Sequence, residues 1–228
     1  NRTKFRQFWS LAGAVKGKKI LDYGGGAGVM SIPLAQEGAD VLLVDAEANA
    51  LRTARYYAEK KLVTNNIRTI HSESLPESLG KERFDVIIAK DVIEHIEDDR
   101  KFLKDLANCQ DKGGVLLLST QNRISLNYLL EGSYQKYWRR NIDWFGWDQT
   151  HLRFYTSWDL KKKLADAGYR TMKWAGVYII PYDILSWASL LKFKFRLDSL
   201  HHLDLLFGRL FPFNRLGWSI IVRAEKTS

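Results

Sequence analysis

The sequence predicts an α/β fold, in which a doubly wound, mostly parallel β-sheet is covered by helices on both faces. Short, almost continuously apolar segments alternate with longer amphipathic segments over the first half of the chain, as expected for strands buried on both faces. The first apolar segment also ends in a run of glycines, which is typical of a strand that turns sharply into a helix. The chain has 228 residues and no internal repeat or linker, so we expect one domain, 1–228.

The elements of the first half follow from this alternation. We expect strands where a short apolar segment is bounded by polar residues or glycines, and helices where apolar residues recur at helical spacing. The predicted strands are 18–24, 40–46, 67–72, 84–90 and 114–120, and the predicted helices are 29–38, 47–62 and 98–109. Asp98 or Asp99 is expected to cap the last of these helices.

The second half is less regular and holds fewer predicted elements. Thr156, three residues before Asp159, forms a capping signature for a helix over 156–168. Two last strands are expected at 169–180 and 216–226.

Composition limits the class of protein. Hydrophobic residues make up 46% and charged residues 27% of the chain, as in soluble globular proteins. No apolar segment reaches the ~18 residues that a membrane-spanning helix needs. The single cysteine, Cys109, excludes an internal disulfide and favours a reducing compartment, so we expect a cytoplasmic protein. The net charge of +9 is compatible with nucleic acid, a membrane surface or an anionic substrate.

The stretch DYGGGAG follows the first strand and opens the first helix. Glycines let a backbone turn tightly and approach a ligand closely, with helix N–H groups facing it. A dinucleotide fingerprint needs G-x-G-x-x-G, but the last position here is Val29, and the G-K-S/T of a P-loop is absent. The pattern that does match is D-x-G-x-G-x-G, formed by Asp22, Gly24, Gly26 and Gly28.

This pattern resembles the first motif of class I S-adenosylmethionine (SAM) methyltransferases. In that family an acidic residue ends the second strand, and Asp45 stands there in this sequence. The resemblance implies that its carboxylate accepts hydrogen bonds from the ribose diol of SAM. It also implies that Glu73 lies beside the adenine. Ala46, Ser74 and Lys90 adjoin these motifs and complete the implied cofactor set.

The resemblance covers residues 18–122, the implied SAM-binding core. It implies a Rossmann-like, seven-stranded sheet, mostly parallel with an antiparallel last strand, plus helical insertions. SAM would occupy one half of the crevice at the carboxyl ends of the strands, and the acceptor would occupy the other half.

The segment KDVIEHIEDD follows the fourth predicted strand and would face the acceptor. Asp91, Glu94 and His95 occupy positions i, i+3 and i+4, which share one face of a helical turn. Oxygen and imidazole ligands suit Mg²⁺, Mn²⁺, Fe²⁺ or Zn²⁺. The segment resembles the acid-x-x-Glu-His signature of the ubiquinone-biosynthesis O-methyltransferases and of the small-RNA 3′-terminal 2′-O-methyltransferases. In the latter, a later histidine completes a divalent metal site, and His151 would take that position here.

The expected metal ligands are therefore Asp91, Glu94, His95 and His151, and the alternatives to a metal site are a metal-free general base and a purely structural role. Asp91 stands where these families usually carry glutamate, and its shorter side chain reaches less far. His95 or His151 could act without a metal as a general base, because the unperturbed pKa of histidine lies near neutrality. A purely structural role is the other alternative.

Residues 123–155 mix aromatic rings with cations. A base-stacking RNA site would show the same mixture, but no RNA-binding module is recognisable, so nucleic acid is disfavoured. The preceding STQNR resembles a substrate-bordering loop of the quinone O-methyltransferases. We therefore expect 123–155 to form a lid over the acceptor, with a packed helical cap as the alternative.

Residues 181–215 are rich in leucine and phenylalanine and are interrupted by cations. This amphipathic insertion between the last two strands could lie on an anionic membrane, peripherally on its inner face. It could instead form a homodimer face, a lid or part of the core.

Together these features predict a SAM-dependent O-methyltransferase for a hydroxyl on an amphipathic or lipid-linked small molecule, such as a polyprenyl phenol. One alternative is methylation of a surface-polysaccharide glycan or of an RNA 3′ terminus. The non-enzymatic alternative is a SAM-binding scaffold of a membrane complex.

Overall fold

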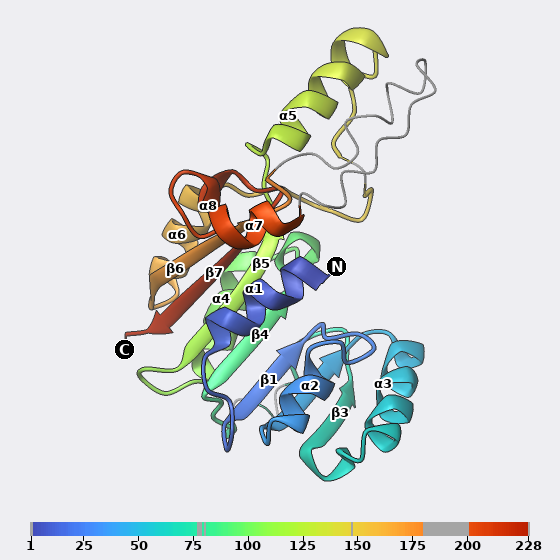
Figure 1. Ribbon diagram of the computed structural model, residues 1–228, viewed down its shortest axis with the longest axis vertical. Helices are drawn as coiled ribbons and strands as arrows, with labels where there is room; N and C mark the ends of the chain where they lie inside the picture. Colours follow the sequence, from blue (N-terminus) through green and yellow to red (C-terminus); the bar gives the residue numbers. More distant parts are fainter. Residues whose placement is uncertain (1, 77–78, 80, 147, 180–200, 228) are drawn as a thin grey trace.

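The structure is a computed structural model, and it describes residues 2–76, 79, 81–146, 148–179 and 201–227 (Figure 1). Most of the predicted amphipathic insertion, 181–200, lies outside the described residues. None of the helices in the described ranges combines the length and apolar character needed to cross a bilayer.

A single seven-stranded sheet forms the centre of the molecule, in the order β3-β2-β1-β4-β5-β7-β6. Its strands are β1 Lys19–Tyr23, β2 Asp40–Asp45, β3 Ile67–His71, β4 Val86–Lys90, β5 Val115–Gln121, β6 Tyr169–Val177 and β7 Ser219–Lys226. Strands β1 to β5 pair in parallel, whereas β7 runs antiparallel to both β5 and β6. The predicted fold class is confirmed, including the antiparallel last strand.

Helices cover both faces of this sheet, as Figure 1 shows. One core cluster packs α1 and α2 against the sheet, and the other packs α4 and α6 against the opposite face. The helices are α1 Arg2–Ala12, α2 Ser31–Gln36, α3 Ala48–Lys60, α4 Asp99–Asn108, α5 Leu126–Ser133, α6 Ser157–Asp166, α7 His201–Phe207 and α8 Phe213–Leu216. Buried apolar side chains on both faces explain why the strands are nearly continuously hydrophobic.

The predicted helix caps are present. The Thr156 hydroxyl accepts a hydrogen bond from the Asp159 N–H at 3.1 Å, and the Asp159 carboxylate accepts one from the Thr156 N–H at 3.0 Å, which completes a capping box. Asp98 caps α4 by accepting from the Lys101 N–H at 2.9 Å. The alternative cap, Asp99, is the first residue of α4 and is buried.

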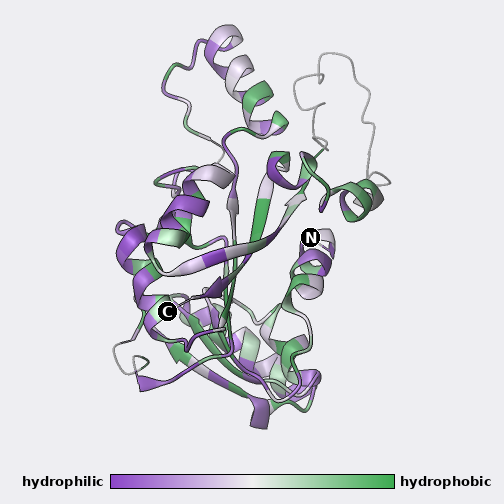
Figure 2. Cartoon of the chain, turned by 90° about the vertical axis from the view of Figure 1, so that its left-hand side faces the viewer, coloured by the Kyte–Doolittle hydropathy of each residue, from purple (hydrophilic) through white to green (hydrophobic). Residues whose placement is uncertain are grey.

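Some elements were not predicted. Helix α1 precedes the first strand, and α5 lies within the predicted lid. A π-helical turn, Tyr134–Trp138 (η4), continues α5, and the two project beyond the rest of the fold in both views (Figures 1 and 2). Helix α7 lies in the last part of the predicted amphipathic insertion, 181–215, and α8 begins there and ends at Leu216.

Candidate active site

The glycine loop connects β1 to α2 at the carboxyl edge of the sheet. Gly24, Gly26 and Gly28 have φ values of +69°, +58° and +76°, a left-handed conformation that favours glycine. The Gly24 N–H donates to the Val44 carbonyl at 2.8 Å, which ties the loop to β2. A Cβ on Gly26 would meet nothing within 4 Å, so the space beside it is open to a ligand.

Gly25 is a loop residue that the sequence motif did not single out. A Cβ at this position would lie 2.3 Å from a Leu43 methyl group and 2.5 Å from an Asp22 oxygen. No side chain fits there, so Gly25 is required for close packing of the loop on the sheet. The run of three glycines was the signal that could have identified it.

Asp22 lies beneath this loop and is buried. Its carboxylate accepts a hydrogen bond from the Ser31 hydroxyl at 2.6 Å, which joins the end of β1 to α2. Burial raises the pKa of Asp22 to about 6, and the Ser31 hydrogen bond opposes that rise. Asp22 therefore holds the glycine loop in position, and it would affect cofactor binding only indirectly, through that loop.

Asp45 ends β2 beside the loop. Its carboxylate accepts from the Gly26 N–H at 2.7 Å and from the Glu47 N–H at 2.8 Å. A carboxylate offers about four acceptor sites, so these two bonds orient the group and leave it able to accept from a diol. The adjacent Ala46 is exposed, and its carbonyl lies 2.8 Å from His71 Nε2.

The remaining predicted cofactor residues lie at the carboxyl ends of the neighbouring strands. Glu73 and Ser74 follow β3 and are exposed. Lys90 ends β4 and is partly buried, with its ammonium 3.6 Å from an Asp91 oxygen. Their contacts with a cofactor stay predictions.

The part of the edge that was predicted to face the acceptor begins with a 3₁₀ helix, Ile93–His95 (η3). The structure brings Glu94, His95 and His151 together, with one possible ligand atom from each lying within 4.8 Å of the others. The two imidazole rings meet edge to face, with centroids 4.7 Å apart. The Leu152 N–H donates to the Glu94 carbonyl at 2.9 Å, so a backbone contact holds His151 beside η3.

Glu94 is completely buried, and neither of its carboxylate oxygens has a hydrogen-bond partner among the described residues. Burial, followed by the charge of Asp91, raises its pKa to about 7. His151 is also buried, and its Nδ1 lacks a partner among those residues. Burial lowers its pKa below the ordinary value, which Asp148 opposes. Unsatisfied buried polar atoms indicate a ligand or proton-transfer site.

His95 is the exposed member of this cluster. Its Nδ1 lies 3.2 Å from the Thr150 carbonyl and 3.3 Å from the Thr150 hydroxyl. Thr150 in turn donates both its N–H and its hydroxyl to Asp148. The ring is therefore oriented from the loop that also carries His151.

The structure does not bring Asp91 into the cluster, contrary to the expected four-residue convergence. Asp91 has a φ of +57°, and its carboxylate binds the Lys4 ammonium and accepts from the Ser119 hydroxyl at 2.9 Å. Although burial opposes ionisation, the charges of Lys4 and Lys90 lower the pKa of Asp91 to about 2. Because Lys4 occupies the short carboxylate, the candidate metal ligands are Glu94, His95 and His151.

One carboxylate and two imidazoles form a donor set that fits a divalent metal ion. The buried, unpartnered oxygens of Glu94 and the unpartnered Nδ1 of His151 are observations that favour such a ligand. The same groups fit metal-free proton transfer equally well, so the geometry accommodates both predicted versions of the site.

Lys4 is a residue of the candidate site that sequence reasoning missed. It lies on α1, 87 positions from Asp91, and its side chain is only 5% exposed. Burial lowers the pKa of Lys4, and the charge of Asp91 opposes this. No local motif links the two residues, since the contact exists only once α1 packs on the sheet.

Aromatic rings border the histidine cluster. Phe154 lies 5.4 Å from His151, 4.9 Å from Tyr128 and 5.3 Å from Phe145, measured between ring centroids. Tyr128 belongs to α5, so this contact connects the predicted lid with the cluster. An apolar wall beside polar reactive groups suits an acceptor with an aromatic or hydrocarbon part.

Comparisons with known proteins agree with this geometry. A methyltransferase domain family matches residues 2–173. A ubiquinone biosynthesis O-methyltransferase of Azorhizobium caulinodans is 31% identical over 169 residues, which are 73% of this chain and 64% of the relative. The enzyme of the same name from Psychrobacter arcticus is 31% identical over 175 residues, 76% of this chain and 67% of the relative. The chain thus spans about two thirds of the length of the second relative and slightly less than two thirds of the first.

Solved structures show the same fold at low identity. A SAM-dependent methyltransferase from Mesorhizobium loti has a TM-score of 0.64 and 15% identity, covering 98% of both chains. Magnesium protoporphyrin IX methyltransferase from Synechocystis, with S-adenosylhomocysteine bound, has a TM-score of 0.64 and 20% identity, covering 99% of this chain and 84% of that one. Domain match, curated relatives and fold agree, and the chain therefore belongs to the class I SAM-dependent methyltransferase family.

Proposed function

We propose that the protein transfers the methyl group of SAM to a hydroxyl oxygen of an amphipathic or lipid-linked small molecule. The observation that carries this proposal is the cluster of Glu94, His95 and His151 at the carboxyl edge of the sheet, on the acceptor side of the glycine loop. The similarity to proteins named ubiquinone biosynthesis O-methyltransferase supports an oxygen acceptor.

The chain's residues have two tasks in this reaction. SAM supplies a methyl group that its sulfonium already activates, so the protein must align the acceptor and remove the hydroxyl proton. His151 suits proton removal, because burial lowers its pKa and its Nδ1 has no partner among the described residues. A neutral imidazole nitrogen can accept the hydroxyl proton at neutral pH.

A divalent ion would be held by Glu94, His95 and His151, and it would lower the pKa of a hydroxyl bound to it. In that version the three side chains act as ligands, and Asp91 stays with Lys4. Chelation separates the versions: EDTA abolishes activity if metal is required, and Mg²⁺, Mn²⁺ or Zn²⁺ restores it. Activity that is unchanged by EDTA assigns the proton to a histidine.

The apolar surroundings support a lipid-like acceptor. Leu126 and Leu129 are about half exposed on α5, the helix that also carries Tyr128, so a hydrocarbon chain could cover them. Around α7 and α8, Leu210 and Phe211 are 55% and 81% exposed. We propose that 181–215, which includes these residues, contacts an anionic membrane from which such an acceptor is drawn.

An acceptor panel tests the proposal. Radiolabelled SAM is offered with a polyprenyl catechol in detergent, a polysaccharide-precursor glycan and a short RNA, and the label is measured in each product. The proposal expects label in the polyprenyl compound. Label confined to glycan or RNA favours the alternative acceptors, and tight SAM binding without transfer to any of them favours the scaffold.

The matched variants are His151→Ala and Arg170→Gln. Arg170 lies on β6, is exposed and pairs at 3.9 Å with Glu225, away from the histidine cluster. Arg170→Gln should therefore retain transfer, whereas His151→Ala should lose it while binding SAM normally.

A further inference from the structure

A polar cavity lies between α1, β6 and the segment around α8, apart from the candidate active site. It has a volume of about 450 Å³ and is lined by Lys173, Arg209 and Arg215 together with Trp174 and Asn214. No aspartate or glutamate lines it. It is built from the last strands and α1, whereas the candidate active site is built from the glycine loop, η3 and the loop that carries His151.

Arg215 carries an uncompensated charge in this cavity. Its guanidinium carbon lies 4.2 Å from the centroid of the Trp174 ring, a cation–π contact. Its Nε is buried and has no hydrogen-bond partner among the described residues, and the same holds for Asn214 Oδ1. Burial lowers the pKa of Arg215, and no acidic group offsets that effect. A shielded cation without a counter-charge costs free energy, which a bound anion would recover.

Arg209 is held in place by neutral partners. Its Nε donates to Gln7 Oε1 at 2.9 Å, and its terminal nitrogen donates to the Ser10 hydroxyl. Both partners belong to α1, so the guanidinium is oriented while its charge remains available. Lys173 contributes an exposed ammonium. None of these three cations takes part in an ion pair among the described residues.

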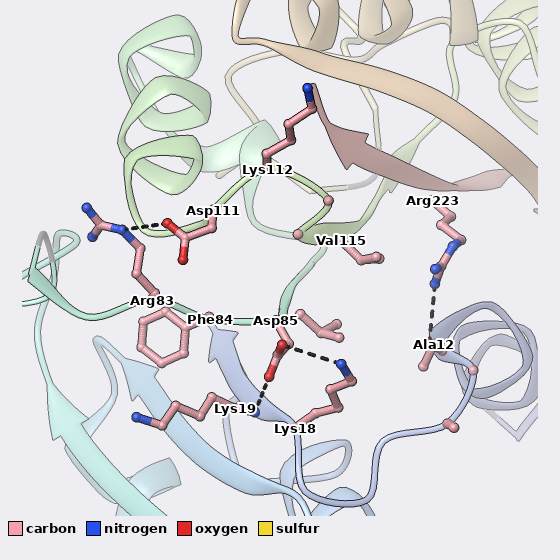
Figure 3. Close-up of a pocket in the computed structure, with 15 residues that line it drawn as sticks. Ala12, Lys18, Lys19, Arg83, Phe84, Asp85, Asp111, Lys112, Val115 and Arg223 are labelled. Carbon is pink, nitrogen blue, oxygen red and sulfur yellow. Dashed lines mark hydrogen bonds and ion pairs between the residues drawn. The ribbon is translucent and has the colours of Figure 1, made fainter. Parts of the chain in front are cut away.

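Another cavity, of about 620 Å³, also contains several cations, but some of them are paired with carboxylates (Figure 3). It lies at the amino ends of β1, β4 and β5, and it contains carboxylates as well as cations. Asp85 lies 3.4 Å from the Lys18 ammonium, and Asp111 lies 3.3 Å from the Arg83 guanidinium. Its internal carboxylates already compensate part of its positive charge, unlike the cavity beside Arg215.

We propose that the cavity formed by Lys173, Arg209 and Arg215 binds a phosphate-bearing ligand. Guanidinium groups match phosphate oxygens in pairs, and the ammonium adds a point charge. The exposed side chains of Leu210 and Phe211 follow Arg209 in the chain, so a phosphate attached to an apolar tail would find both kinds of partner. The ligand is either a phospholipid headgroup or a soluble phosphate compound. This inference does not rest on methyl transfer.

The test uses two probes on the full chain without SAM. Calorimetry measures binding of inorganic pyrophosphate, and co-sedimentation measures binding to phosphatidylcholine vesicles with and without phosphatidic acid. Arg215→Gln and Lys173→Gln should each lower the affinity for whichever probe binds the wild type by about tenfold, since a lost charge-assisted hydrogen bond typically has at least that effect. Arg170→Gln, on the same strand but outside the cavity, should leave binding unchanged.

The two probes distinguish a soluble phosphate compound from a phospholipid headgroup. Pyrophosphate binding that both cavity variants weaken identifies a soluble phosphate, and vesicle binding alone with that sensitivity identifies a lipid headgroup. Two results overturn the proposal: neither probe binds, or Lys173→Gln and Arg215→Gln, both folded by circular dichroism, bind as the Arg170→Gln control does.

Discussion

The ion pair between Lys4 and Asp91 determines whether the Asp91 carboxylate can join the cluster of Glu94, His95 and His151. The ammonium of Lys4 is almost buried and binds a carboxylate that is 30% exposed. Without Lys4, Asp91 would keep only the Lys90 ammonium, at 3.6 Å, as a cationic partner among the described residues. It also lies beside Glu94, whose pKa is raised by burial and then by the charge of Asp91. The ion pair therefore anchors the end of β4 and keeps Asp91 apart from the histidines.

We expect Lys4→Met to destabilise the fold by about 1–3 kcal/mol, the usual cost of removing one partner from a partly buried, charged hydrogen bond. The pKa of Asp91 is lowered to about 2, so the stabilisation is present above the unfolded pKa, near 4, and is lost as pH falls toward 2. Urea unfolding at pH 7 and at pH 3 measures the difference between variant and wild type.

The control for this prediction is Lys18→Met. The Lys18–Asp85 pair is about half exposed at both ends, and such pairs contribute little. If Lys4→Met unfolds at the same urea concentration as Lys18→Met at pH 7, the anchoring role of Lys4 is wrong.

Asp22 leads to the opposite pH dependence. Its pKa is raised from 3.8 to about 6 by burial, so the fold favours the protonated carboxyl. Stability should be highest below the unfolded pKa and should fall as pH rises through 6. Asp22→Asn should remove this pH-dependent contribution to the free energy of unfolding, which amounts to at most about 3 kcal/mol. Unfolding of SAM-free protein between pH 4 and 8 checks it; parallel curves for variant and wild type would refute the raised pKa.

At the scale of elements, the strands and the glycine loop were predictable because their signals are local. An apolar strand, a run of glycines and a terminal acid occur within a few residues of one another, as in 18–28 and 40–45. Helix α1 was not predictable in this way, because its buried side chains include Thr3, Lys4 and Gln7, which dilute the apolar stripe. Helix α5 has no buried residue, so no core-facing pattern marks it.

The residues of the candidate site were likewise only partly predictable from the sequence. Glu94 and His95 come within five residues of the end of β4, so their position at the sheet edge followed from the sequence. His151 was placed only by resemblance, because its contact with η3 depends on a backbone bond between segments distant in the chain. The separation of Asp91 from the cluster could not be predicted, since it requires both the position of α1 and a left-handed backbone at Asp91.

The glycine loop gives a prediction at this scale. Gly25→Ala would place a methyl group within 2.5 Å of Leu43 and Asp22 atoms, so the loop must shift away from the sheet. We expect SAM affinity, measured by calorimetry, to fall at least tenfold, about 1.4 kcal/mol. Gly113→Ala is the control, because a Cβ there meets nothing within 4 Å and the residue lies far from the loop, although its φ of +86° makes an alanine strained. Equal SAM affinities for the two variants would show that the loop does not hold the cofactor.

At the scale of the whole molecule, the sheet order places the proposed cofactor-binding and acceptor-binding groups side by side. Strands β2 and β1 carry Asp45 and the glycine loop, and the adjacent β4 leads into η3. The last strands, α1 and α7 are joined on one face, where Gln7 of α1 donates to the Asp204 carbonyl at 2.9 Å. Helix α1 thus connects the Lys4–Asp91 pair with α7, which lies within the proposed membrane-contacting segment 181–215.

The most direct test of the account is methyl transfer by His151→Ala under saturating radiolabelled SAM and a polyprenyl catechol. The account predicts that turnover falls by roughly 10²–10⁴, the usual contribution of a general base, with SAM affinity unchanged. The same loss is expected if His151 holds a metal ion, and sensitivity of the wild type to EDTA tells the two versions apart. Wild-type turnover by a correctly folded His151→Ala variant would contradict the account.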